Sequence, residues 1–202
     1  VVGVLGDIGA GKSFVWKQFK CPIFNADIEV NKIYRNSKTC YKKLKNKLPK
    51  YLKSYPIDKI ELTKAILAKK YNLKKIINVV HPLIRKKMNN FLKKNAKKKL
   101  VVLDVPLLIE NNLNKKKYIL IFVDSKKTKI NEHLKKRKNY NKKIIENLRK
   151  LQKTAVHKKK LSTYIIKNNF KLLTIKKRVK LIKYDIINER NSTWYRNNWL
   201  IS

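Results

Sequence analysis

Four residues near the start of the chain match a pattern by which loops bind the phosphates of a nucleotide. The pattern G-x-x-x-x-G-K-[ST] is satisfied at every fixed position by Gly6, Gly11, Lys12 and Ser13. Glycine reaches positive φ and permits close backbone approach at little cost, and all four glycines of the chain fall within its first eleven residues. The backbone N–H groups of such a loop point at the anion. We therefore expect Lys12 to reach the β- and γ-phosphates and Ser13 to ligate Mg²⁺.

Two carboxylates follow apolar runs and could take part in the chemistry of that loop. Asp104 ends the run 100–104, where enzymes with such a loop place the carboxylate that supports Mg²⁺, although an acid there can also cap a turn. Asp27 ends the shorter run 22–27. It could accept a proton from a substrate hydroxyl, or it could be the N-cap of a helix starting at Ile28. Position alone leaves these alternatives open.

A parallel sheet would bring these residues together. An apolar run at 1–5 precedes the loop, and a helical spacing of apolar residues follows it at Phe14, Val15, Trp16 and Phe19. Further strands are predicted at residues 22–27, 100–104, 118–124 and 164–166. Near-continuous apolar strands alternating with helices are typical of a parallel sheet covered on both faces. The predicted fold class is therefore α/β, a three-layer P-loop NTPase fold with a parallel sheet of about five strands.

Residues 28–97 are predicted to be almost entirely helical, which is too long for a simple connection between two strands. The helical pattern from Ile28 is interrupted at Pro49, and Asp58 is expected to cap a later helix. A further helical stripe is expected to end at His81-Pro82, followed by another basic helix. Part of this segment is therefore interpreted as a helical substrate-binding insertion.

The predicted organisation is one P-loop domain over residues 1–187. Its core is expected at 1–27 and 98–187, the insertion at about 56–97 and a helical lid at about 130–155. For Arg137 and Arg149, on basic helices of that lid, contact with a transferring phosphoryl group and a solvated helix face are both possible. Residues 188–202 hold two of the three tryptophans and no lysine, and we assign this C-terminal extension no role.

The chain is strongly basic, with 53 Lys and Arg against 12 Asp and Glu and a net charge of +41. Such a charge is typical of nucleic-acid-binding proteins. The basic residues are nevertheless spread over many predicted helices and loops, and the runs 100–110 and 118–124 contain none. We interpret the excess mainly as a compositional bias at exposed positions. No specific nucleic-acid partner is expected, although a positive field also favours a substrate with several phosphates.

Compartment is indicated by what the sequence lacks. Cys21 and Cys40 form neither a disulfide framework nor a metal-ligand spacing. No apolar run approaches the roughly 18 residues that a membrane span requires, and no signal-peptide pattern is seen. We expect a cytoplasmic protein without a membrane partner, and a monomer is favoured.

Further short segments agree, in order and spacing, with one enzyme family. Over roughly residues 1–185 the sequence resembles dephospho-coenzyme A (dephospho-CoA) kinase. Beside the loop 6–13, the matches are Asn25-Ala26-Asp27 for Asp-Ala-Asp, Asp58-Lys59-Ile60-Glu61-Leu62 for Asp-Arg-x-x-Leu, His81-Pro82-Leu83-Ile84-Arg85 for His-Pro-x-Ile-Arg, Asp104-Val105-Pro106-Leu107-Leu108-Ile109-Glu110 for Asp-x-Pro-Leu-Leu-x-Glu, and Ile166-Lys167-Asn168 for Ile-x-Asn.

The resemblance implies transfer of the γ-phosphoryl group of ATP to the ribose 3′-hydroxyl of dephospho-CoA. It implies that Asp27, Lys12 and Arg137 are catalytic, with Asp27 as base or orienter of the hydroxyl, and that Ser13 and Asp104 hold Mg²⁺. The implied ATP-binding residues are Gly6, Gly9, Ala10, Gly11, Lys12, Ser13, Phe14 and Asn168. The implied residues on the acceptor side are Asp27, Lys59, His81, Arg85, Leu107 and Glu110.

The sequence departs from the family's pattern at several positions. Asn25 replaces the first acid of its pair, Phe14 replaces a common threonine, and Lys59 replaces an arginine and so loses the planar fork. In the lid, the departures are Ile130 and His133, where glutamine and arginine are usual, and Leu148, which falls where an arginine is expected next to Arg149. Ser162-Thr163 replaces an Ala-Asp pair. These changes bear on the lid more than on the reaction.

Two other functions share part of these features. A kinase for nucleosides or nucleoside monophosphates would have the loop and a lid, but it would not need the elements at 81–85 and 104–110. A nucleic-acid-associated P-loop ATPase would explain the net charge of +41, but it should gather its basic residues into one stripe with aromatic residues.

Overall fold

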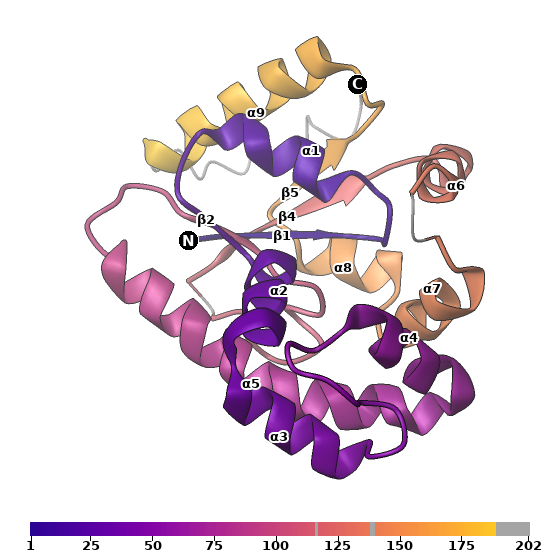
Figure 1. The fold of residues 1–202 in the computed structure, drawn as a ribbon. Coiled ribbons are helices and arrows are strands. Elements are labelled where there is room, and N and C mark those ends of the chain that lie inside the picture. The colour runs from indigo at the N-terminus through magenta and orange to yellow at the C-terminus, as the bar shows by residue number, and fades with distance from the viewer. Residues whose placement is uncertain (116, 138–139, 189–202) are drawn as a thin grey trace. The chain divides into compact units, whose positions relative to one another are not determined.

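A five-stranded sheet carries the loop at its centre (Figure 1). The strand order is β2-β3-β1-β4-β5, and β1 pairs in parallel with β3 and β4, as β4 does with β5. The strands are β1 (Val2–Gly6), β2 (Ile23–Asn25), β3 (Val102–Asp104), β4 (Ile119–Asp124) and β5 (Tyr164–Lys167). The predicted α/β fold with a parallel sheet of five strands is thus confirmed, although β3 is shorter than the predicted run 100–104.

This computed structural model describes residues 1–115, 117–137 and 140–188. The C-terminal extension predicted at 188–202 lies, apart from its first residue, outside the described residues. The chain forms two compact units, one comprising residues 1–24 and 97 onward and the other residues 25–96. The helical unit therefore begins at Asn25, whereas the sequence placed the insertion at about 56–97. Among the described helices, none is long and apolar enough to cross a membrane.

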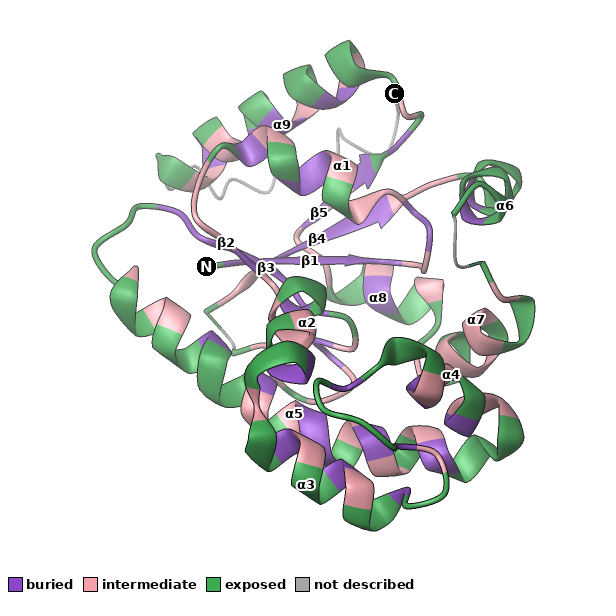
Figure 2. Ribbon diagram, viewed as in Figure 1, coloured by how far each residue is buried: buried purple, intermediate pink, exposed green. Residues whose placement is uncertain are grey.

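Helices cover both faces of the sheet in the first unit. Helices α1 (Lys12–Trp16) and α9 (Leu172–Ile187) and the short 3-10 helix η1 (Lys17–Phe19) pack on one face, and α8 (Ala155–Leu161) contacts β1 and β4 from the other (Figure 1). The remaining helices of this unit are α6 (Lys127–Lys135) and α7 (Lys142–Arg149). This arrangement follows from strands that are apolar on both sides, because each face must be covered. Figure 2 shows β1 and β3 buried throughout and β4 buried between its end residues, whereas β2 and β5 also contain less buried positions.

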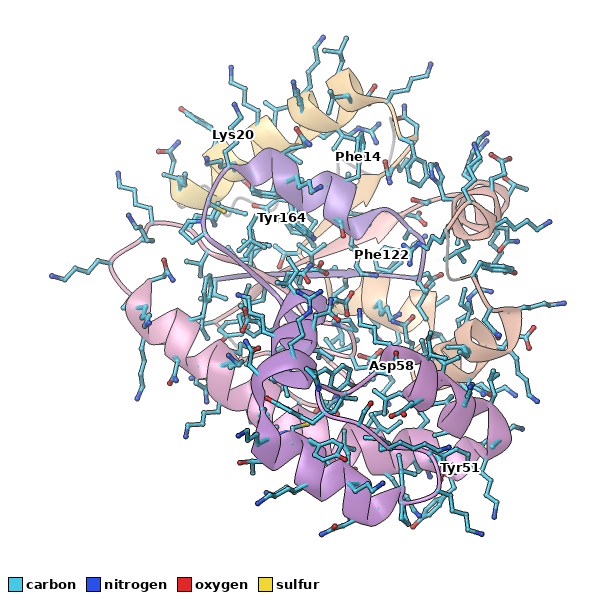
Figure 3. All side chains as sticks on the ribbon, viewed as in Figure 1. Phe14, Lys20, Tyr51, Asp58, Phe122 and Tyr164 are labelled. Atoms are coloured by element: carbon cyan, nitrogen blue, oxygen red, sulfur yellow. The ribbon has the colours of Figure 1, made fainter. Side chains whose placement is uncertain are left out.

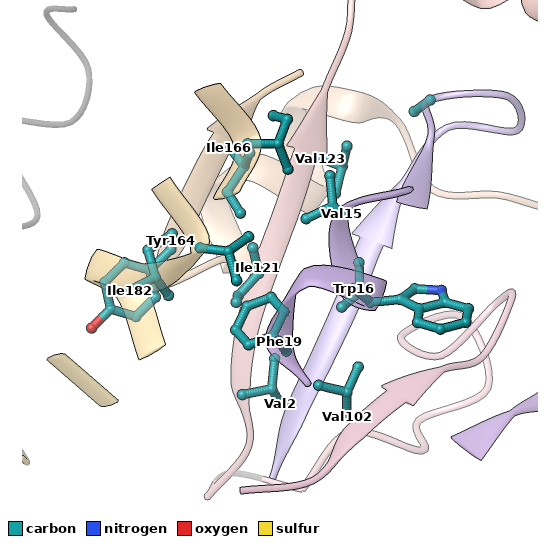
Figure 4. Close-up of a cluster of buried hydrophobic side chains, with 14 of the residues drawn as sticks. Val2, Val15, Trp16, Phe19, Val102, Ile121, Val123, Tyr164, Ile166 and Ile182 are labelled. Carbon is teal, nitrogen blue, oxygen red and sulfur yellow. The ribbon is translucent and has the colours of Figure 1, made fainter. Parts of the chain in front are cut away.

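The core of this unit lies between the sheet and the helices α1 and α9. Val2, Ile121 and Ile166 from three strands meet Phe19 and Ile182, and all five side chains are essentially inaccessible to solvent (Figure 4). Of the residues predicted for the inner face after the loop, Val15, Trp16 and Phe19 are buried and Phe14 is half-buried. The apolar spacing thus identified the packing face, although the helix itself is only five residues long.

The helical unit consists of four helices: α2 (Ala26–Asn36), α3 (Lys38–Lys47), α4 (Lys59–Ala68) and α5 (Lys70–Lys94). The Asp58 side chain accepts a hydrogen bond from the backbone N–H of Ile60 and is the N-cap of α4, which confirms that prediction (Figure 3). The helical pattern predicted from Ile28 to about Leu52, with an interruption at Pro49, is divided by Ser37, whose side chain caps α3.

The expected helix end at His81-Pro82 is wrong, because α5 continues through Pro82 for 25 residues in all. A proline in a helix interior removes one backbone hydrogen bond and costs about 3 kcal/mol. Buried apolar residues lie on both sides of it, at Ile76, Val80, Ile84 and Met88, and α5 packs against α2, α3 and α4. Burial of a large apolar side chain is worth about 1.5–3 kcal/mol, so this packing outweighs the local cost.

Candidate active site

The predicted strand, loop and helix are present, with the loop between β1 and α1. Gly9 and Gly11 have φ values of 90° and 79°, and Gly11 is the left-handed N-cap of α1. A Cβ atom at Gly11 would lie 2.4 Å from the side-chain nitrogen of Asn168 and 2.7 Å from the ring of Phe170. Both the backbone conformation and the lack of space therefore require glycine at this position.

Asn168 supports the loop from the end of β5. Its side-chain N–H donates to the carbonyl oxygen of Ala10 at 2.9 Å, and its side-chain oxygen accepts from the backbone N–H of Phe170. The Ser125 hydroxyl donates to the same Ala10 oxygen at 2.8 Å. Asn168 is only 5% exposed, so its visible role is to hold the loop. The sequence did not single out Ser125, because no feature distinguishes a supporting serine from a turn residue.

Lys12 lies over the start of its own loop. Its ammonium group donates to the carbonyl oxygens of Gly6 and Asp7, at 3.2 and 3.1 Å. Lys12 is half-buried and Ser13, in the same first turn of α1, is exposed. An ammonium group at this place can exchange carbonyl oxygens for phosphate oxygens, which are stronger acceptors for a charged donor.

Asp104 ends β3 and is 5% exposed. Its Oδ2 accepts a hydrogen bond of 2.7 Å from the indole N–H of Trp16, which follows Ser13 by one helical turn. Asp104 and Ser13 thus belong to two elements that pack against each other. One hydroxyl and one carboxylate, with water and phosphate oxygens completing the shell, are the ligands that Mg²⁺ takes in phosphate sites. The residues present therefore fit Mg²⁺. Within the described ranges no three His, Cys, Asp or Glu residues gather into a denser metal site.

The segment after Asp104 is strained and lies beside the loop. Leu107 has a φ of 63°, which costs a non-glycine residue about 1–3 kcal/mol. Its carbonyl oxygen accepts from both the backbone and the side chain of Asn111. Glu110 accepts a hydrogen bond from the backbone N–H of Lys153 at 2.8 Å. A small cavity joins this segment to the loop; its lining includes Gly6, Lys12, Pro106, Leu107, Glu110, Gln152 and Lys158. The structure thus brings Leu107 and Glu110 to the loop, and their predicted contact with the acceptor stays a prediction.

Lys158 is a site residue that the sequence did not reveal. It is 2% exposed, and its ammonium group lies 3.5 Å from Oδ1 of Asp7 and 3.1 Å from the side-chain oxygen of Gln152. In the sequence it is the first of three consecutive lysines in a chain rich in lysine. Only the burial of this one side chain distinguishes it.

The predicted lid residues differ in what they contact. The ring of His133, on α6, stacks on Phe170 with ring centroids 3.9 Å apart and planes inclined by 25°. Phe14 lies beside the same ring, with the two ring centroids 6.3 Å apart. Arg137 and Arg149 are exposed, Arg137 just beyond the end of α6 and Arg149 at the end of α7. A phosphoryl contact for Arg137 stays a prediction.

Asp27 lies in the first turn of α2 and is exposed. The alternative that it caps a helix starting at Ile28 is wrong. The helix starts at Ala26, and the side chain of Asn25 accepts the capping hydrogen bond from the backbone N–H of Ile28 at 2.9 Å. Asn and Asp are about equally good N-caps, so Asn25, two residues before Asp27, is sufficient to cap this helix. Asp27 is thereby free of a capping role and has a negative charge where the helix dipole favours one.

A pocket of about 530 Å³ lies within the helical unit. Its lining combines cations with apolar and hydroxyl groups: Ile28, Asn31, Lys32, Tyr34, Arg35, Ile57, Asp58 and Lys59. Burial, with a smaller contribution from Cys40, raises the pKa of Tyr34, so its hydroxyl keeps its proton and can donate. Of the residues predicted for the acceptor, Lys59 lines this pocket, and Arg35 joins it without any signal in the sequence.

His81 and Arg85 lie on α5 and are absent from the residues described as lining that pocket. His81 is half-buried and Arg85 is exposed. Their predicted contact with the acceptor stays a prediction.

Comparison with known proteins agrees with this geometry. The chain is 30% identical over 171 residues to the dephospho-CoA kinase of Wolbachia pipientis wMel, which covers 82% of this chain and 87% of that relative. It is 29% identical, with the same coverage, to the enzyme of that name from Wolbachia sp. subsp. Brugia malayi.

The fold is shared with two solved structures. TT1252 from Thermus thermophilus matches with a TM-score of 0.73, 21% identity and coverage of 91% of this chain and 96% of that one. The dephospho-CoA kinase from Campylobacter jejuni matches with a TM-score of 0.61, 20% identity and coverage of 92% and 96%. The model of the dephospho-CoA kinase family matches residues 1–173, and the chain therefore belongs to this family, as the resemblance in its sequence implied.

Proposed function

We propose that this protein transfers the γ-phosphoryl group of ATP to the ribose 3′-hydroxyl of dephospho-CoA and so forms coenzyme A. The observation that carries the proposal is the glycine-specific loop between β1 and α1 with the buried carboxylate of Asp104 on the adjoining strand. Because the chain belongs to this family, we assign these features to the triphosphate and metal side of the reaction. Phosphoryl transfer of this kind depends on positioning and on charge neutralisation.

On the ATP side, the proposal gives each group one task. The loop N–H groups and the N-terminus of α1 bind the phosphates, and Lys12 exchanges its carbonyl partners for phosphate oxygens. Ser13 and Asp104 would hold Mg²⁺, which would neutralise negative charge on the phosphate oxygens. Arg137 adds positive charge from the lid.

On the acceptor side, Asp27 orients the 3′-hydroxyl and accepts its proton. The pocket of about 530 Å³ takes part of the acceptor: Arg35 and Lys59 suit its phosphates, and the apolar side chains Ile28 and Ile57 suit its uncharged portion. His81 and Arg85 complete this side from α5. We propose that the enzyme acts as a monomer. We also propose that it acts in the cytoplasm, in agreement with the free thiols of Cys21 and Cys40.

The test is a coupled assay of ADP release, with dephospho-CoA set against a panel of nucleosides and nucleoside monophosphates. Of these acceptors, we expect only dephospho-CoA to be turned over. The product should have the mass of coenzyme A, and the rate should depend on Mg²⁺. The Lys12→Ala variant should lose activity, whereas Lys17→Ala, at an exposed position on the next turn, should keep it. Faster turnover of a nucleoside or nucleoside monophosphate would instead favour the second kinase function.

A further inference from the structure

Asp7 places a carboxylate inside a loop that binds anions. It directly follows Gly6, and its backbone carbonyl accepts from both Lys12 and the N–H of Ala10. A negative charge at this place repels a triphosphate. A cation near Asp7 is therefore needed if the loop is to bind ATP well.

Lys158 supplies that cation. Its ammonium group lies 3.5 Å from the Asp7 carboxylate, and its other described partner is the neutral side chain of Gln152 at 3.1 Å. The two members of the pair differ in exposure: the Lys158 side chain is 3% accessible and the Asp7 side chain 36%. A buried ammonium group is retained only where a counter-charge and hydrogen bonds compensate its lost hydration.

The neighbours of Lys158 in sequence behave differently. Lys159 is half-exposed and pairs with Asp124 at 2.7 Å, and Lys160 is exposed. Among the described residues, Lys158 is the only lysine in the buried class. Its position on α8, which packs against β1 and β4, directs it to the loop rather than to solvent.

Lys158 and Lys12 line the same small cavity, together with Gly6 at the start of the loop. The ammonium group of Lys12 donates to the Asp7 carbonyl oxygen, and that of Lys158 lies beside the Asp7 carboxylate. The carboxylate that lines this cavity, Glu110, accepts a hydrogen bond from the backbone N–H of Lys153. Asp7 is therefore the counter-charge that the described contacts give to Lys158.

We propose that Lys158 is a second phosphate-binding lysine of this loop and that Asp7 is its exchangeable counter-charge. With ATP in the loop, the ammonium group of Lys158 leaves the Asp7 carboxylate for an oxygen of the triphosphate. The more exposed Asp7 then turns toward water, where its charge is solvated. This inference rests on the loop being the ATP site, as proposed above.

The exchange predicts opposite effects for the two members of the pair. Loss of the Lys158 charge removes a charge-assisted hydrogen bond to ATP, which corresponds to about a tenfold rise in Kd. Without its charge, Asp7 neither competes with the triphosphate for the ammonium group of Lys158 nor repels the triphosphate. ATP should therefore bind several-fold more tightly. A purely structural ion pair predicts instead that both substitutions weaken ATP binding or leave it unchanged.

The experiment is isothermal titration calorimetry of ATP, ADP and AMP with the full chain and its variants. Lys158→Met should raise the Kd for ATP by about tenfold and that for AMP by much less, because AMP lacks the β- and γ-phosphates. Lys158→Arg should restore most of the ATP affinity, Lys159→Met is the matched control without effect, and Asp7→Asn should lower the Kd for ATP.

Equal effects of Lys158→Met on ATP and AMP, or failure of Asp7→Asn to tighten ATP binding, would overturn the proposal. An ammonium group replaced by an apolar side chain of similar shape is usually tolerated in a protein interior, and thermal unfolding of each variant checks this. If Lys158→Met does not fold, Asp7→Asn and Lys158→Arg decide alone. Lys12→Ala separates the two proposals. Unchanged ATP binding by Lys12→Ala would refute the loop as the ATP site. If Lys12→Ala loses ATP binding while Lys158→Met keeps the wild-type affinity, only the role of Lys158 is refuted.

Discussion

Trp16 donates its indole N–H to Asp104 across 2.7 Å, and both residues are buried. The hydrogen bond links the helix that begins at Lys12 to the end of β3. It orients one carboxylate oxygen of the residue that we propose to support Mg²⁺. Trp16 is therefore a positioning residue, acting on the metal site through Asp104.

Replacing Trp16 by Phe keeps an aromatic ring and removes the donor. We expect the free energy of unfolding to fall by about 1–3 kcal/mol, because a buried carboxylate loses this hydrogen bond. We also expect the Mg²⁺ concentration for half-maximal activity to rise several-fold, since the carboxylate is less well oriented. Mg²⁺ titrations of activity and denaturant unfolding measure the two effects.

The matched control is Phe19→Leu, which alters a fully buried aromatic residue in the adjoining 3-10 helix. It should lower stability without changing the Mg²⁺ requirement. A Trp16→Phe variant with an unaltered Mg²⁺ requirement would show that the hydrogen bond serves packing alone.

Asp27→Asn should lower turnover by about 10²–10⁴-fold, the range typical of general-base catalysis. ATP affinity and stability should change little, because the cap of α2 is Asn25 and not Asp27. Steady-state kinetics and nucleotide binding on this variant are the measurements.

The control for Asp27 is Asn25→Ala, which removes the observed capping hydrogen bond. It should cost about 1 kcal/mol of stability and have a smaller effect on turnover. Full turnover by Asp27→Asn would move the base assignment to another carboxylate, Asp104 or Glu110.

Gly11→Ala should disrupt the loop. The residue has a φ of 79°, and the new Cβ would lie 2.4 Å from the side chain of Asn168, which itself holds Ala10. We expect a loss of about 1–3 kcal/mol in stability from the strained backbone, with a marked loss of ATP affinity. Thermal unfolding and ATP titration test this, and wild-type affinity in the variant would contradict the described loop geometry.

The net charge of +41 should give only weak, non-specific binding to duplex DNA. Side chains that end in nitrogen project from helices of both units (Figure 3), as a compositional excess at exposed positions would produce. Affinity for a random duplex should therefore fall steeply as salt rises, because counterion release drives such binding. Filter-binding or anisotropy measurements across a salt series would reveal this, and sequence-selective binding at physiological salt would favour the nucleic-acid-associated ATPase.

Local signals in the sequence were enough for the loop, the strands and the Asp58 cap. Each depends on residues close together in the chain: glycines at fixed spacing, apolar runs that must be buried on both sides, and a side chain that reaches an N–H two residues on. The family followed for the same reason, since its motifs are short and lie in a fixed order. The local sequence therefore predicts these features without knowledge of the tertiary structure.

Only the tertiary structure decided the rest, because packing and burial depend on residues far apart in sequence. Pro82 lies within α5 since apolar contacts on both sides outweigh its local cost. Whether Asp27 is a helix cap depended on where α2 begins. Lys158 looks like its neighbours in sequence, and it differs from them because α8 packs on the sheet and directs this one ammonium group to Asp7.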